Sequence, residues 1–306
     1  MEKNEGKMSN PPTIEHGLIS VIGRRRSMED AFTVYPNLVR LKCDVHEHKH
    51  KHEDEHENKK GKKQVETSYD FFAVFDGHGS NKVSDRCKER LHHLVADEMT
   101  RVERGAVDVD WQSVMANSFA RMEAEVTATL SSFGRKKVGA TALVVVVVGT
   151  AEIVVASFGD CRVVLFRDDA SLQLSRCPKV ERSAEQERTE AGGINLRDLL
   201  SGAPLTPRSI EAEVEVCKRN GLDDFIVIGT DGLWDVIDND TAGDMVRKCF
   251  RGQVSKTVLE GVDGNCAAAA ATMLAELAIA RGSRDNISVI VVQLRAFDAN
   301  SSSFTK

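Results

Sequence analysis

Three short segments place an aspartate beside a glycine or asparagine at the end of an apolar strand. These segments are Asp70–Gly79, Phe225–Asp235 and Gly282–Val292. Their strand-end carboxylates are Asp76, Asp231 and Asp285. Carboxylate oxygens next to glycines, which let the backbone approach closely, are the ligands that Mg²⁺ and Mn²⁺ prefer. A single Asp-Gly pair is more often only a turn, but three such ends in one chain predict a metal-centred active site.

The order of these and other blocks resembles the protein phosphatase 2C family of metal-dependent serine/threonine phosphatases. The matching blocks are Gly23–Asp30, Asp76–Gly79, Gly139–Ala142, Phe158–Arg162, Asp231–Asp235 and Gly282–Asn286. They extend over nearly the whole chain, and Arg86–Leu91 resembles plant members of the abscisic-acid-signalling group. The resemblance implies hydrolysis of phosphoserine and phosphothreonine in proteins by a metal-bridged hydroxide, without a covalent enzyme intermediate.

The same resemblance implies a two-ion Mg²⁺ or Mn²⁺ site. Its ligands would be a bridging Asp76, the carbonyl of Gly77, Asp231, Asp285 and, through water, Glu29. Asp30 and Asn286 would lie in the surrounding shell that orients metal-bound waters. Asp160 and Asp235 match acidic positions that hold a third, weaker ion in some members, although Asp160 could instead cap a tight hairpin turn.

Two further side chains complete the expected chemistry. Arg25 matches the family's phosphate-binding arginine, whose guanidinium can grip two phosphate oxygens at once. Its neighbours Arg24 and Arg26 would be ordinary surface charges. His78 would protonate the leaving oxygen, because its ordinary pKa is near neutrality, or it would hold a carboxylate ligand in place.

The elements that must position these residues alternate in type along the chain. Helical spacing of apolar residues predicts helices over Val83–Val102 and Trp111–Leu130. We also expect helices over Thr241–Phe250 and Cys266–Ala280, the latter because it is rich in alanine, which has a strong intrinsic helix propensity. Apolar runs predict strands at Leu18–Ile22, Ala31–Val39, Leu143–Val148, Ile153–Ser157, Val163–Phe166 and Ile287–Leu294. This grouping indicates an α+β fold, and the resemblance implies a four-layer α/β/β/α sandwich of two mainly antiparallel sheets flanked by helix pairs.

Composition limits the class of protein. We expect one domain over residues 16–296, with a disordered lead over 1–15, a disordered tail over 297–306 and a polar His/Lys/Glu-rich loop over 46–66. The histidines of this loop could bind transition metals weakly. The net charge of −6 argues against a nucleic-acid-binding role. Seven cysteines without a C-x-x-C pair, and no signal-peptide pattern, favour the cytoplasm or nucleus. We expect a monomer without a membrane partner.

One region departs from the family pattern. Between Arg162 and Asp231 the chain is shorter than its relatives, and Leu205–Ile210 is a remnant of a longer segment. The flap stretch Ala191–Leu200 contains no tryptophan. Since abscisic-acid receptors engage a flap tryptophan in the plant relatives, we expect hormone-dependent inhibition to be weak or absent.

The shortened region keeps a second hypothesis open, namely a catalytically weak or inactive pseudophosphatase that binds phosphoproteins or kinases. The complete set of carboxylates argues against it. A third hypothesis, a two-metal phosphohydrolase for small molecules or nucleic acid, is disfavoured by the acidic charge and the family blocks.

Overall fold

The computed structural model describes residues 14–45, 63–102, 109–130, 138–175, 212–253 and 265–295. Most of the predicted lead and polar loop, and the predicted tail, lie outside these residues. The same holds for the flap stretch Ala191–Leu200 and for the remnant Leu205–Ile210.

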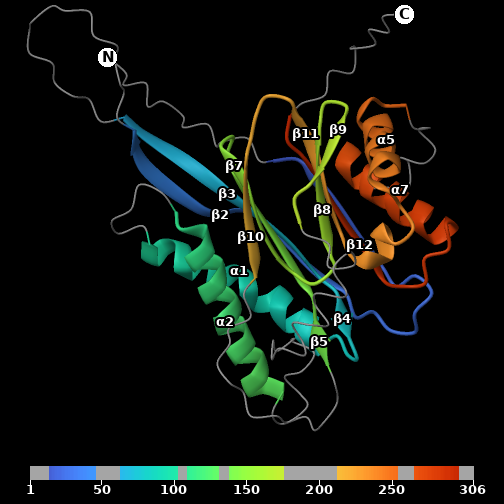
Figure 1. Cartoon of the computed structure of the whole chain (residues 1–306), viewed down its shortest axis with the longest axis horizontal. Coiled ribbons are helices and arrows are strands. Elements are labelled where there is room, and N and C mark those ends of the chain that lie inside the picture. The colour runs from blue at the N-terminus through green and yellow to red at the C-terminus, as the bar shows by residue number, and fades with distance from the viewer. Residues whose placement is uncertain are drawn as a thin grey trace, which may run out of the picture.

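Two five-stranded antiparallel sheets form the centre of the structure (Figure 1). Sheet I has the order β10-β7-β6-β3-β2, and sheet II has the order β1-β12-β11-β8-β9. The strands of sheet I are β10 (Glu213–Lys218), β7 (Glu152–Phe158), β6 (Ala142–Val148), β3 (Lys63–Phe75) and β2 (Ala31–Val45). Those of sheet II are β1 (His16–Val21), β12 (Ile287–Gln293), β11 (Asp223–Gly229), β8 (Arg162–Arg167) and β9 (Ala170–Gln173). A separate short ribbon pairs β4 (Gly77–His78) with β5 (Gly139–Ala140).

Helices cover the outer face of each sheet. The helices α1 (Lys82–Val102) and α2 (Trp111–Leu130) pack against sheet I, while α5 (Asn239–Phe250) and α7 (Cys266–Ala280) pack against sheet II (Figure 1). A single helical turn, α4 (Asp231–Trp234), follows β11. The predicted four-layer α/β/β/α sandwich is therefore confirmed. No helix in the described part of the chain is long and apolar enough to span a bilayer.

The two-residue period of the strands divides their side chains between the layers. On β3, Phe71, Ala73 and Phe75 face α1 and α2, whereas Phe72 and Val74 lie between the two sheets. All of β6 is buried, because one face lies under the helices and the other against sheet II. The uninterrupted valine run of this strand follows from that double burial.

Every predicted site residue lies at one end of this sandwich. The strands β3, β7 and β11 end there, and β2 and β12 begin there, as their bounds and antiparallel register show. The loop between β1 and β2 lies at the same end.

Five elements were not predicted, namely the two-residue strands β4 and β5, the strands β9 and β10, and the helical turn α4. The short strand β9 is largely exposed, and β10 alternates Glu with Val at the edge of its sheet, so neither carries a strong apolar signal. The turn α4 is too short for helical periodicity to appear in the sequence.

The close packing of β1 on α7 generates the first prediction. A Cβ atom added to Gly17 would lie 2.0 Å from the backbone N of Ala268. Because backbone cannot yield easily, we expect Gly17→Ala to lower the free energy of unfolding by about 3 kcal/mol in urea titrations.

Gly221→Ala is the matched control, since nothing lies within 4 Å of its added Cβ. We expect this variant to be neutral or slightly more stable. Equal effects of the two substitutions would contradict the packing described for β1 and α7.

Candidate metal centre

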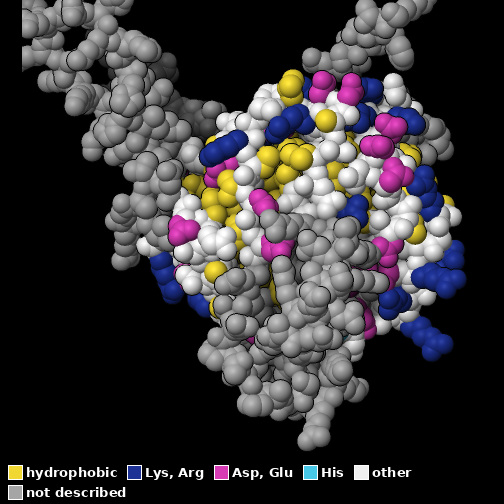
Figure 2. All heavy atoms as spheres, viewed as in Figure 1, with side chains coloured by type: hydrophobic (Ala, Val, Ile, Leu, Met, Phe, Trp, Pro, Cys, Tyr) yellow, Lys and Arg dark blue, Asp and Glu magenta, His cyan; other side chains and the backbone are white. Residues whose placement is uncertain are grey.

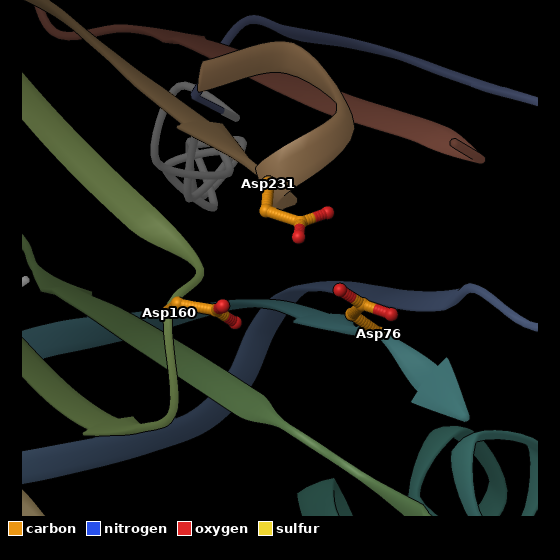
Figure 3. A group of neighbouring side chains, drawn as sticks. All are labelled: Asp76, Asp160 and Asp231. Carbon is orange, nitrogen blue, oxygen red and sulfur yellow. The ribbon is translucent and has the colours of Figure 1, made fainter. Parts of the chain in front are cut away.

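Three carboxylates from distant parts of the chain converge at the end of the sandwich. Asp76 follows β3, Asp160 lies in the turn between β7 and β8, and Asp231 begins α4. One oxygen from each lies within 4.8 Å of the others. Figure 3 shows the three side chains pointing into a common space between their ribbons. Among the described residues, this is the only such group of three or more His, Cys, Asp or Glu side chains.

This arrangement fits a hard divalent cation. Oxygen ligands on opposite sides of Mg²⁺ are about 4 Å apart, close to the separation seen here, and all three donors are carboxylates. The charges also require compensation. Burial, followed by repulsion from Asp30, Asp231, Asp160 and Asp285, raises the pKa of Asp76 to about 9. A bound cation would allow Asp76 to ionise at neutral pH, because it replaces repulsion with attraction.

Asp30 lies beside this group, in a network of buried hydroxyls. Its Oδ2 accepts hydrogen bonds from Thr230 Oγ1 at 3.0 Å and from Ser288 Oγ at 2.8 Å. Ser288 Oγ in turn lies 2.7 Å from Ser20 Oγ. Burial raises the pKa of Asp30 to about 6, although the two hydroxyl donors act in the opposite direction. The network thus fixes the orientation of Asp30 toward the metal centre.

Thr230 shows how local structure serves this network. It occupies the N-cap position of α4, where a threonine hydroxyl usually accepts from the helix backbone. Here no such side-chain bond forms, and the hydroxyl donates to Asp30 instead. The same oxygen accepts from the backbone N of Ser288 at 3.1 Å, which joins β11 to β12 beside the site.

Asn286 holds the loop that carries Glu29 and Arg25. Its Oδ1 accepts from the backbone N of Glu29 at 2.8 Å, and its Nδ2 donates to the carbonyls of Ile22 at 2.8 Å and Ser27 at 3.1 Å. The Glu29 carbonyl also accepts from Ser84 Oγ at 2.5 Å. The loop is therefore anchored to β12 on one side and α1 on the other.

Arg25 and Asp285 form an ion pair at the rim of the site. Arg25 Nη2 lies 2.5 Å from Asp285 Oδ2, and Asp285 Oδ1 accepts from the backbone N of Asn286 at 2.8 Å. Asp285 lies near enough to contribute to the raised pKa of Asp76. The structure does not, however, include it in the group of three carboxylates.

The remaining predicted residues lie around this centre. Gly77 is packed so closely that an added Cβ would lie 2.3 Å from the Glu29 carbonyl oxygen, so only glycine fits. The imidazole of His78 lies against Gly139 of β5, with which it pairs. Glu29 Oε1 accepts from Ser27 Oγ at 3.2 Å. Asp235 is exposed at the end of α4, where its backbone N donates to the Asp231 carbonyl at 2.9 Å.

Sequence reasoning missed the hydroxyl and backbone anchors, Thr230, Ser288, Ser20 and Ser84. A weak signal existed, because Ser288 interrupts the apolar run Ile287–Val292 and faces Ser20 in the strand register. A polar residue inside a buried strand needs a partner, but the sequence does not show that the partner is Asp30.

The raised pKa of Asp76 generates the second prediction. Because the folded chain binds this proton more tightly than the unfolded chain, Asp76 lowers stability as the pH rises from its ordinary value of 3.8 toward about 9. Without divalent cations, Asp76→Asn should therefore melt at a higher temperature than the natural chain at about pH 8. The difference should shrink on acidification. Mn²⁺ should raise the melting temperature of the natural chain more than that of the variant.

Melting curves across this pH range, with and without Mn²⁺, measure both effects. A variant that is no more stable at alkaline pH, and that gains as much from Mn²⁺, would contradict the electrostatic description of the site.

Comparisons with known proteins identify the family. The protein phosphatase 2C family profile matches residues 39–287. A rice relative, probable protein phosphatase 2C 8 of Oryza sativa subsp. japonica, is 42% identical over 93% of this chain and 75% of its own length.

Solved structures share the fold. Serine-threonine phosphatase 2C from Toxoplasma gondii covers 93% of this chain and 96% of its own, with 19% identity and a TM-score of 0.61. The catalytic domain of the serine threonine protein phosphatase PstP, solved in complex with two manganese ions, covers 92% and 98%, with 17% identity and a TM-score of 0.56. The chain belongs to the protein phosphatase 2C family and is a serine/threonine phosphatase that depends on Mg²⁺ or Mn²⁺.

Proposed function

We propose that this phosphatase hydrolyses phosphoserine and phosphothreonine in proteins at a two-cation site built on Asp76. The convergence of Asp76, Asp160 and Asp231 is the observation that carries the proposal. Asp76, the Gly77 carbonyl, Asp231, Asp285 and Glu29 would hold the two ions, and Asp160 with Asp235 would hold a weaker third. When bound, the cations offset the charge of the phosphate and lower the pKa of water.

Arg25 binds the phosphate group of the substrate in this proposal. Its side chain is 54% exposed, so the guanidinium can reach an incoming phosphate, and its ion pair with Asp285 places it beside the carboxylates. A guanidinium can donate two parallel hydrogen bonds to phosphate oxygens, which orients the phosphorus for attack. Asn286 and Ser84 support this role because they fix the loop from which Arg25 projects.

His78 donates a proton from a ring N–H to the departing serine or threonine oxygen. Its position directly after Asp76 and Gly77 supports this role, since the ribbon of β4 and β5 limits the movement of its backbone. The acid role needs a protonated ring near neutral pH, which the ordinary pKa of histidine permits. Hydrogen bonds from Thr230 and Ser288 hold the Asp30 carboxylate in place beside the metal ligands of this proposal.

The third prediction tests this function directly. We expect the full chain to release phosphate from a phosphothreonine peptide in the presence of Mn²⁺, and to stop when the metal is chelated. Asp76→Ala should lower kcat/KM by at least about a hundredfold, because loss of a direct ligand exceeds the effect of losing an outer partner. Arg25→Lys should mainly raise KM, because lysine lacks the planar fork.

Asp244→Ala is the control for removal of a carboxylate. Asp244 is exposed on α5 and pairs only loosely with Arg247, at 4.0 Å. Turnover should be unaffected in this variant. A folded natural chain that releases no phosphate with Mn²⁺ would contradict the proposal and favour a phosphoprotein-binding pseudophosphatase.

The fourth prediction concerns the anchor of the Arg25 loop. Asn286→Ala removes three hydrogen bonds that join the buried Asn286 side chain to the backbone of the Arg25 loop. We expect a loss of about 2–3 kcal/mol in stability and a fall of about ten- to a hundredfold in kcat/KM, mostly through KM.

Asn220→Ala provides the comparison, because its Oδ1 accepts from Leu222 N at 2.8 Å in the turn at the opposite end of β11. It should lower stability without changing kcat/KM. An Asn286 variant with unchanged KM would show that the loop does not depend on this anchor.

A further inference from the structure

A group of exposed arginines lies beside the proposed phosphate site. Arg24 and Arg26 flank Arg25 in the loop between β1 and β2, and Arg284 precedes Asp285 in the turn before β12. All three are exposed. We name Arg24, Arg26 and Arg284 the arginine rim.

The two turns that carry the arginine rim are in direct contact. An added Cβ on Gly23 would lie 2.1 Å from the Asp285 carbonyl oxygen. Asn286 Nδ2 donates hydrogen bonds to the carbonyls of Ile22 and Ser27, which lie on either side of the run Arg24–Arg26. Dark blue side chains project from this lower right edge of the molecule, where the β1–β2 loop meets the turn before β12 (Figures 1 and 2).

Two acidic side chains near the rim, Asp285 and Asp238, have cationic partners, whereas the Glu29 carboxylate accepts from Ser27 Oγ at 3.2 Å. Asp285 is paired with Arg25 at 2.5 Å, and Asp238 lies 3.6 Å from Arg281. In contrast, no described residue forms an ion pair or hydrogen bond with the side chain of Arg24, Arg26 or Arg284. Within the described part of the chain, these three guanidinium groups therefore have no bound partner and can bind an anion.

We infer that the arginine rim selects substrates with an anionic group, a carboxylate or a second phosphate, within a few residues of the phosphorylated serine or threonine. This inference rests on the proposed role of Arg25. Residues one to three positions from the phosphoresidue lie within about 11 Å of it in an extended peptide. With the phosphate on Arg25, such residues come within reach of the adjacent arginines.

Electrostatics favours this substrate class over neutral or basic peptides. Guanidinium groups bind carboxylates and phosphates with paired hydrogen bonds. Each exposed pair is weak, so a single arginine should change kcat/KM by only about two- to fivefold. Three together give a preference that salt should screen strongly.

The test compares four phosphothreonine peptides that differ only at the second and third residues after the phosphothreonine. These residues are aspartates, asparagines, lysines, or a phosphoserine followed by asparagine. Because the phosphoserine can itself be hydrolysed, fragment mass spectrometry follows the loss of phosphate from the phosphothreonine alone. We expect the full chain with Mn²⁺ to favour the aspartate and phosphoserine peptides over the asparagine peptide by about fivefold or more in kcat/KM at low salt. The lysine peptide should be the poorest substrate. The preference should largely vanish at about 1 M salt.

The triple substitution Arg24→Gln, Arg26→Gln and Arg284→Gln should bring the ratio of aspartate to asparagine peptides close to one. Arg251→Gln is the charge-matched control, an exposed arginine at the far end of α5, and should leave the ratio unchanged. Preference for the phosphoserine peptide alone would restrict the inference to multiply phosphorylated substrates. Equal rates for all four peptides in the natural chain would overturn it.

Failure of the proposed function gives a different result. If no peptide is hydrolysed, fluorescence anisotropy of the same peptides still measures their relative affinities for the natural chain and the triple variant. If the natural chain binds the anionic peptides more tightly and the triple variant does not, the arginine rim recognises anionic peptides even though the protein does not hydrolyse them. Equal affinities would refute it.

Discussion

Mutual repulsion among carboxylates at one end of the sandwich is the constraint on which the rest of the site depends. Burial, together with repulsion from four other acidic side chains, raises the pKa of Asp76 to about 9. Without a cation at this position, the folded protein would become more stable if these acidic side chains were removed. Their persistence as a convergent group, on elements that meet only in the folded chain, is explained by a divalent ion that turns repulsion into coordination.

In this fold, apolar strands provide the rigid support, and the acidic residues lie in the turns at the ends of those strands. Apolar strands on both sheets bring Asp76, Asp160 and Asp231 to one end and hold their backbones in place. The buried carboxylate of Asp30 accepts hydrogen bonds from the hydroxyls of Thr230 and Ser288. Amide and hydroxyl anchors from Asn286 and Ser84 fix the loop of Glu29 and Arg25. The residues proposed to face the substrate thus lie on a loop that is held by the hydrogen bonds of Asn286 and Ser84.

Much of this arrangement could be predicted from the sequence. The helices α2 and α7 were predicted with the bounds that the structure shows, α2 from its helical periodicity and α7 from its alanine-rich composition. The strand-end aspartates were found because Asp-Gly after an apolar run is a local pattern. The convergence of Asp160 with Asp76 and Asp231 was less apparent, since it depends on how β7 registers with β6.

Other features have no local signature. The hydroxyl network joins Asp30 to Thr230, 200 positions away along the chain, and to Ser288, 258 positions away. In the sequence, Asn286 is only the neighbour of a predicted metal ligand. In the structure, its side-chain amide makes three hydrogen bonds to the backbone of the Arg25 loop. Such roles are set by tertiary contacts between two strands and a loop, and a single sequence does not contain them.

Anomalous diffraction from crystals grown with Mn²⁺ would test the central claim most directly, because it locates the ions rather than their consequences. We predict two manganese peaks at the end of the sandwich, both within coordination distance of Asp76, with Asp231 contacting at least one. Peaks that avoid Asp76, or a site that stays empty at saturating Mn²⁺, would contradict the account.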